Sequence, residues 1–137
     1  AAEELANVEG AGSDLVIVEG QGAIVHPGYA GVTLALMYGV MPDCMIMAHN
    51  VERDKLKRLD TPIRPLTELI DLHERLMRPF KTSRVVAVTL NTSSLGEGPA
   101  RAAIESTQRE TGLPTADVVR FGCGPILDAL LEHLNLT

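Results

Sequence analysis

The sequence predicts an α/β fold in three layers, α/β/α, with a mostly parallel sheet of at least four strands. Four short apolar runs, at 14–20, 43–49, 84–91 and 116–122, are continuous rather than alternating, as is typical of strands buried on both faces. Helical patterns separate these runs, and strand–helix alternation indicates parallel pairing. No repeat, low-complexity tract or linker divides the chain, so we expect one domain over 1–137.

The first elements have clear start and stop signals. A helix over 1–8 precedes the first strand, 14–20, and an apolar helix over 30–40 ends before Pro42. The second strand, 43–49, follows this proline.

The only long polar connection is 50–65, and connections of that length are often lids or binding loops. A helix over 66–78 comes next and stops at Pro79. Its expected ion pairs at i,i+4 spacing are Asp71–Arg75 and Glu74–Arg78. The apolar face of this helix consists of Leu66, Leu69, Ile70, His73 and Met77.

Two more helices complete the alternation around the third and fourth strands. Ser94 and Glu97 have the spacing of a capping box, and the helix that follows, 100–112, closes at Gly112. Pro125 opens the last helix. The expected buried stripe of that helix is Ile126, Leu127, Leu130, Leu131 and Leu134.

Composition and charge disfavour several classes of partner. The net charge of −6 and the 3% aromatic content argue against nucleic acid and anionic membranes as partners. No apolar run reaches the ~18 residues of a membrane span, and the acidic start lacks the features of a signal peptide. Cys44 and Cys123 form no CxxC motif and read as inert packing residues, so we expect a reduced, cytoplasmic protein. The chain starts without Met inside a helical pattern, which favours a fragment.

Familiar nucleotide and metal motifs are missing from the sequence. Each of its three Gly-x-Gly pairs lacks the third glycine or alanine of a dinucleotide fingerprint. No lysine stands in a Gly-Lys-Ser/Thr phosphate loop, and there is no HExxH motif or zinc-spaced Cys/His cluster.

The predicted site lies where the strands end, because ligands of parallel sheets bind outside the carboxyl ends of the strands. Polar or glycine residues occupy all four ends: Glu19-Gly20-Gln21-Gly22, His49-Asn50, Asn91-Thr92 and Arg120-Phe121-Gly122. Glu19, at the tip of an apolar strand, could hold magnesium or orient water; alternatively, it caps a turn or pairs with an arginine. Asn91 could read a base edge or form a turn.

The histidines and arginines near these ends are candidates for proton transfer and anion binding. His26 and His49 could act as general bases. The alternative for His26 is a capping or surface role before a helix. Arg53 and Arg64 could bind a carboxylate or phosphate, or could simply be solvated.

The segments 18–50, 85–95 and 111–122 together resemble the C-terminal half of the D-glutamate N-acetyltransferase family. The most specific matches are Glu19-Gly20-Gln21-Gly22 with His26-Pro27, Leu90-Asn91-Thr92, and Leu113-Pro114 with Asp117 and Arg120. The resemblance implies a P-loop NTPase-like, dethiobiotin-synthetase-like domain, in which an Asn near a strand end meets adenine. It also implies a larger two-domain protein, whose Rossmann-type domain and phosphate loop lie upstream of this segment.

The implied function is transfer of an acetyl group from acetyl-CoA to the amine of an acidic amino acid such as D-glutamate. Such a reaction needs a base to remove a proton from the ammonium, with Glu19, His26 or His49 as candidates. It also needs cations for the substrate carboxylates, with Arg53 or Arg120 as candidates. Donor binding is expected from Gly20, Gln21, Gly22, Asn91 and Thr92. Without the phosphate loop, the isolated chain should be inactive and prone to form homo-oligomers through an exposed sheet edge.

Two alternatives stay open. The first is a nucleotide-dependent kinase or ligase that uses ATP and a magnesium ion held by Glu19. The second is a non-catalytic module for binding or oligomerisation.

Overall fold

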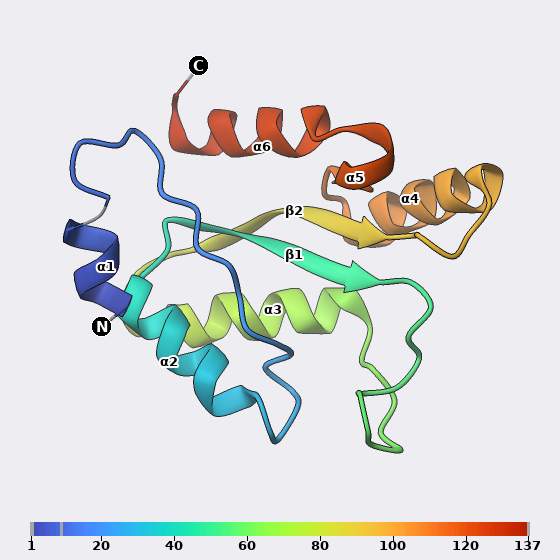
Figure 1. Cartoon of the computed structure of the whole chain (residues 1–137), viewed down its shortest axis with the longest axis horizontal. Helices are drawn as coiled ribbons and strands as arrows, with labels where there is room; N and C mark the ends of the chain where they lie inside the picture. Colours follow the sequence, from blue (N-terminus) through green and yellow to red (C-terminus); the bar gives the residue numbers. More distant parts are fainter. Residues whose placement is uncertain (1, 9, 137) are drawn as a thin grey trace.

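The computed structural model describes residues 2–8 and 10–136 and places a parallel sheet between layers of helices (Figure 1). Helix α6 covers one face of the sheet, and α2 and α3 cover the other. The elements in chain order are α1 (Ala2–Val8), α2 (Ala30–Val40), β1 (Cys44–Asn50), α3 (Leu66–Met77), β2 (Arg84–Asn91), α4 (Glu97–Thr111), β3 (Thr115–Ala116), α5 (Val118–Phe121) and α6 (Gly124–Leu134). None of the helices in the described residues is long and apolar enough to cross a membrane.

The sheet has the strand order β1-β2-β3, and both pairings are parallel. β1 pairs with β2 from Cys44 opposite Arg84 to Asn50 opposite Asn91, so the two strands end together. These are the strands predicted at 43–49 and 84–91, and both are confirmed.

The core lies on both faces of β2, because its side chains alternate between the two helical layers. On one face, Val88 and Leu90 pack against Leu66 and Leu69 of α3. On the other face, the core cluster consists of Ala87, Ala116 and Ile126. Burial on both faces explains why β2 reads as a continuous apolar run.

The prediction of at least four strands is wrong for the described residues, since the sheet has three. Residues 15–20 run extended without joining a ladder, in front of β1 in Figure 1. The four apolar side chains of this run are 37–81% exposed: Leu15, Val16, Ile17 and Val18. An apolar run becomes a strand only where a neighbouring backbone supplies its hydrogen bonds, and none of the described strands pairs with this run.

The predicted strand over 116–122 is confirmed only at its start, because the observed strand overlaps it at Ala116 alone. β3 spans only Thr115–Ala116, and the chain then turns into the short helix α5. The Asp117 side chain caps this helix by accepting hydrogen bonds from the backbone N–H groups of Val119 and Arg120. An N-terminal cap of this kind outweighs the strand preference of two adjacent valines.

Some helix details differ from the expected ones. α4 begins at Glu97 with Gly96 at its cap and no side-chain capping bond, so the Ser94 capping box does not form. Instead Glu97 pairs with Arg101 at 2.9 Å. The expected closure at Gly112 is confirmed, because this residue takes the left-handed conformation with φ of 70°.

One of the two ion pairs predicted for α3 is confirmed. Arg75 lies 3.5 Å from Asp71, as expected. Glu74 pairs with Arg84 of β2 at 2.8 Å instead of with Arg78, and also accepts the backbone N–H of Val85. In α6, Ile126 and Leu130 are buried as expected, whereas Leu127 is 44% exposed.

Candidate functional site

The carboxyl ends of β1 and β2 bring two predicted site segments side by side, because Asn50 and Asn91 are partners in the parallel register. Both side chains fold back onto their own turns. The Asn50 Oδ1 accepts the N–H of Glu52, and the Asn91 Oδ1 accepts the N–H of Ser93, each at 3.0 Å. The two asparagine oxygens therefore hold the backbone of the turns that follow β1 and β2.

His49 is the half-buried histidine at this end of the sheet. Burial lowers the pKa of its imidazole below the ordinary value, and the negative charge of Glu110 opposes this shift only in part. A lowered pKa keeps the ring neutral near pH 7, and a neutral imidazole can accept a proton.

A shallow cleft of about 500 Å³ opens beside His49, between the end of β1, the 51–65 segment and α4. Two arginines line it, Arg53 and Arg64. Arg64 forms an ion pair with Glu68 at 2.9 Å, whereas within the described residues Arg53 has no salt-bridge partner. Arg53 is therefore the cation of this cleft that is available for a carboxylate.

The 51–65 segment is an ordered flap, not a loose loop. Lys55 and Pro62 form an antiparallel bridge, and the Leu56 side chain is buried beneath it. The imidazole of His26 anchors the flap, since its Nε2 donates to the Lys57 carbonyl at 2.8 Å.

The other ring nitrogen of His26 is occupied as well. The Nδ1 accepts the N–H of Gly28 at 3.1 Å, and the ring packs 4.6 Å from that of Tyr29. Proton transfer by His26 therefore requires it to release one of these two bonds.

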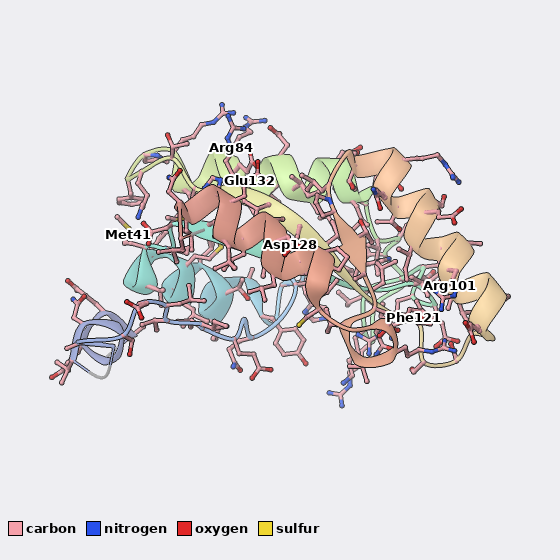
Figure 2. The ribbon with its side chains drawn as sticks, turned by 90° about the horizontal axis from the view of Figure 1, so that it is seen from above. Met41, Arg84, Arg101, Phe121, Asp128 and Glu132 are labelled. Carbon is pink, nitrogen blue, oxygen red and sulfur yellow. The ribbon has the colours of Figure 1, made fainter. Side chains whose placement is uncertain are left out.

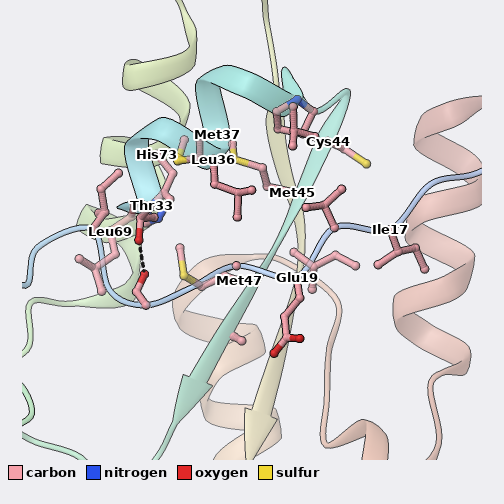
Figure 3. Close-up of a pocket in the computed structure, with 18 of the residues that line it drawn as sticks. Ile17, Glu19, Thr33, Leu36, Met37, Cys44, Met45, Met47, Leu69 and His73 are labelled. Atoms are coloured by element: carbon pink, nitrogen blue, oxygen red, sulfur yellow. Dashed lines mark hydrogen bonds between the residues drawn. The ribbon is translucent and has the colours of Figure 1, made fainter. Parts of the chain in front are cut away.

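Glu19 lies at the edge of a large cavity that His49 and Arg53 also line (Figure 3). The carboxylate of Glu19 extends toward the end of the sheet where β1 and β2 terminate. Gly20 and Gln21 are exposed beside it. Gly22 fixes the turn that follows, because its carbonyl accepts the hydroxyl of buried Thr33 at 3.0 Å.

A second polar cluster, at the ends of β2 and β3, consists of Thr92, Asp117 and Arg120. Asp117 is 3% exposed and accepts the Thr92 hydroxyl at 2.6 Å and the Thr92 N–H at 3.0 Å. Burial alone would raise the pKa of Asp117, but four hydrogen bonds to its carboxylate outweigh burial and lower that pKa.

Arg120 connects this cluster to the turn after β2. Its Nη1 donates to the carbonyls of Thr92 at 2.9 Å and Leu95 at 2.8 Å. Its guanidinium also lies 5.4 Å from the Phe121 ring, whose other cation is Arg101 at 4.2 Å (Figure 2). Arg120 thus holds the backbone of this turn.

The structure groups the predicted site residues unequally. Glu19, His49 and Arg53 share one cavity, with Asn91 adjacent through Asn50. His26 and Arg120 bind backbone carbonyls elsewhere. Within the described residues no group of three or more His, Cys, Asp or Glu side chains could hold a metal ion.

Fold and site together define a three-layer α/β domain whose polar residues gather at the carboxyl ends of parallel strands. The chain belongs to the DUF1611 family: its residues 1–127 match the C-terminal domain of that family, described as a P-loop domain of unknown function. It is 37% identical to a DUF1611 family protein from Anabaena variabilis of solved crystal structure, with a TM-score of 0.91. That likeness covers 96% of this chain and 39% of the other.

Two curated relatives carry the same name. The chain is 38% identical to a D-glutamate N-acetyltransferase from Tritonibacter scottomollicae over 83% of its length. It is 31% identical to one from Pseudoalteromonas sp. over 81% of its length. These matches confirm the resemblance read from the sequence. The chain spans about a third of each relative, 35% and 34% respectively.

Proposed function

We propose that this chain is a domain of an enzyme that transfers an acetyl group to the amine of an acidic amino acid such as D-glutamate. The observation that carries the proposal is the similarity to two relatives named D-glutamate N-acetyltransferase over more than 80% of the chain. Because the chain spans about a third of those relatives, the activity is proposed for the complete protein. We propose acetyl-CoA as the donor.

Acetyl transfer needs a base, because an amino acid is an ammonium ion at neutral pH and cannot attack a carbonyl. Loss of one proton frees the nitrogen pair; the N–C bond forms and the C–S bond of the thioester breaks. A second proton then leaves the nitrogen, and the departing thiolate takes up a proton to become the free thiol. We assign the base to His49, whose lowered pKa keeps it neutral. Arg53 lines the same cleft and is assigned to a substrate carboxylate.

The remaining predicted residues fit supporting roles at the same edge of the sheet. We propose that Glu19 orients the substrate ammonium, since its exposed carboxylate shares the cavity with His49. The exposed backbone of Gly20, Gln21 and Gly22, with Asn91 and Thr92, would contact the donor. His26 and Arg120 are assigned to holding the flap and the β2–α4 turn, through their hydrogen bonds to the carbonyls of Lys57 and Leu95.

The experiment measures thiol release from acetyl-CoA in the presence of D-glutamate, using the complete gene product. We expect His49→Ala to lower kcat by roughly 10²–10⁴-fold, the usual contribution of a positioned base. His133→Ala, an exposed histidine on α6, serves as the matched control. The wild-type rate should fall as pH drops through the lowered pKa of His49. Normal activity of His49→Ala would refute this assignment, and silence of the wild type with both glutamate enantiomers would refute the activity.

A nucleotide-dependent reaction is the second candidate, favoured by the description of the family as a P-loop domain. The 137 residues contain no Gly-Lys-Ser/Thr loop, and among the described residues no group of three or more His, Cys, Asp or Glu side chains could hold a metal ion, so they do not form a complete magnesium–nucleotide site. ATP hydrolysis by the complete protein that is lost in Glu19→Gln would favour this reaction over acetyl transfer.

Calorimetry distinguishes the two enzymatic candidates, acetyl transfer and the nucleotide-dependent reaction, from a non-catalytic module. Acetyl-CoA, ATP and D-glutamate are titrated separately into the complete protein. Binding of any of them at micromolar concentration argues for an enzyme, and silence with all three argues for a binding or oligomerisation module.

A further inference from the structure

Arg64 is a cation of the shallow cleft to which the acetyl transfer described above assigns no role. It lines the cleft of about 500 Å³ together with His49 and Arg53. Arg64 lies just before Pro65, the N-terminal cap of α3, where the positive end of the helix dipole disfavours a cation. The helix dipole of α3 therefore favours a residue other than arginine at this position.

The ion pair that Arg64 forms with Glu68 is easily exchanged. The Arg64 Nη1 donates to the Glu68 carboxylate at 2.9 Å, and the two side chains are 68% and 53% exposed. Exposed pairs contribute little to stability, and a cation four residues before an acid is the weaker orientation on a helix. Glu68 also tolerates separation, because it lies in the first turn of α3, where the helix dipole stabilises a negative charge. A carboxylate of a ligand can therefore replace Glu68 on Arg64.

The shallow cleft and the large cavity meet at His49 and Arg53, because both residues line each of them. Glu19 lines only the large cavity, whereas Arg64 and Glu110 line only the shallow cleft. An amino acid with its amine at His49 and its main-chain carboxylate on Arg53 thus lies at this junction. Its side chain can extend from there into the shallow cleft, toward Arg64.

The shallow cleft offers apolar surface as well as charge. Val51, Ile63 and Ala103 line it and pack against the core, and such surface suits the methylene groups of an amino acid side chain. Two acids, Asp54 and Glu110, line the cleft too, so its two arginines do not create a general positive field. Selection of a carboxylate therefore requires direct contact with a guanidinium, which can bind it through two parallel hydrogen bonds.

We propose that Arg64 is the specificity-determining residue of the acetyl transfer, because it exchanges Glu68 for the side-chain carboxylate of the amino acid. Arg53 then holds the main-chain carboxylate, and the amine stays at His49. A dicarboxylic amino acid satisfies both arginines, whereas an amino acid with a neutral side chain leaves Arg64 paired with Glu68. This inference rests on the proposed acetyl transfer and adds the residue that makes the enzyme prefer an acidic substrate.

Steady-state kinetics of the complete gene product test the proposal with two amino acids of the same shape, D-glutamate and D-glutamine. The amide of D-glutamine replaces the side-chain carboxylate and removes its charge. We expect the wild type to prefer D-glutamate by roughly 10–100-fold in kcat/KM, the usual contribution of hydrogen bonds to a charged group. Arg64→Gln should lower kcat/KM for D-glutamate by roughly the same factor and that for D-glutamine by less than about twofold, so the preference disappears.

Three further variants separate a contact with substrate from a structural role. Glu68→Gln removes the competing partner of Arg64, so it should lower KM for D-glutamate about twofold and leave the kinetics with D-glutamine unchanged. Arg64→Lys should retain part of the preference, because it keeps the charge and loses the two-pronged geometry. Arg58→Gln is the matched control and should change neither reaction, since Arg58 is an exposed arginine of the flap that lines neither cavity.

The inference and the acetyl transfer can fail separately. Equal losses with both amino acids in Arg64→Gln would overturn the inference and leave the acetyl transfer intact. A preference for D-glutamate that survives Arg64→Gln, or a wild type that acetylates both amino acids equally well, would do the same. A wild type inactive with both amino acids would overturn the acetylation of D-glutamate together with the inference.

Discussion

Replacement of Asp117 by alanine should destabilise this domain more than any surface substitution. The carboxylate caps α5 and accepts two bonds from Thr92, a residue with 0% exposure. Loss of the cap costs about 1 kcal/mol, and each buried Thr92 donor that loses a charged acceptor costs about 1.5 kcal/mol or more. The free energy of unfolding should therefore fall by about 4 kcal/mol.

Urea unfolding followed by circular dichroism measures this loss. With an m-value of about 2 kcal/mol/M, the midpoint should fall by roughly 2 M. Asp71→Ala removes an exposed aspartate whose pair with Arg75 is 3.5 Å long, and should cost less than about 0.5 kcal/mol. A loss below about 1 kcal/mol for Asp117→Ala would show that the Thr92 donors find other acceptors, and the reasoning would fail.

The difference in unfolding free energy between the wild type and Asp117→Ala should depend on pH in a direction that the pKa of Asp117 determines. The folded-state pKa of Asp117 lies below its ordinary value of 3.8. Its ionic contribution is thus fully present above the unfolded pKa and is lost as pH falls through the folded pKa. The gap in stability between the wild type and Asp117→Ala should be constant near neutrality and shrink in acid below that ordinary value. A gap that widened in acid would contradict the assignment.

Other substitutions test the core, a turn and an ion pair by the same unfolding measurement. Met77 has 0% exposure, so Met77→Ala should cost about 2–5 kcal/mol and Met77→Leu less than about 1.5 kcal/mol; equal losses would contradict tight packing there. Gly112→Ala should lower the free energy of unfolding by about 1 kcal/mol. The added Cβ meets no atom within 4 Å, so the loss comes only from the positive φ of 70° at this residue. Glu74→Gln should cost less than about 1 kcal/mol, since Arg84 is 59% exposed, and the loss should shrink in high salt.

The hydrophobic pattern correctly predicted the strands that pair with another strand of this chain. The strands at Cys44–Asn50 and Arg84–Asn91 were predictable because their apolar runs pair with each other and are covered by amphipathic helices. The run from Leu15 to Val18 has the same pattern but no strand ladder. A pattern records the tendency to be buried; it does not record whether a neighbouring backbone is present to satisfy the hydrogen bonds.

The candidate site was predictable in position more than in detail. The rule for carboxyl ends placed His49 and Asn91 correctly at one edge of the sheet. Asp117 was predicted as a site residue only through the family resemblance. An aspartate just before a helix is a capping signal, but the two valines that follow Asp117 favoured a strand instead. The double engagement of His26 could not be predicted, because its partner carbonyl at Lys57 is 31 residues away in the chain.

The parallel register has a kinetic consequence. Each residue of β1 meets a β2 partner about 40 positions later in the chain, and no β-hairpin of neighbouring strands exists among the described residues to start the sheet. Every strand pairing must therefore close a long loop, which costs chain entropy before the first hydrogen bond between the strands can form. The helices should form early and the sheet late, so folding should be slow for a domain of this size, with apolar β1 exposed to other chains in the meantime.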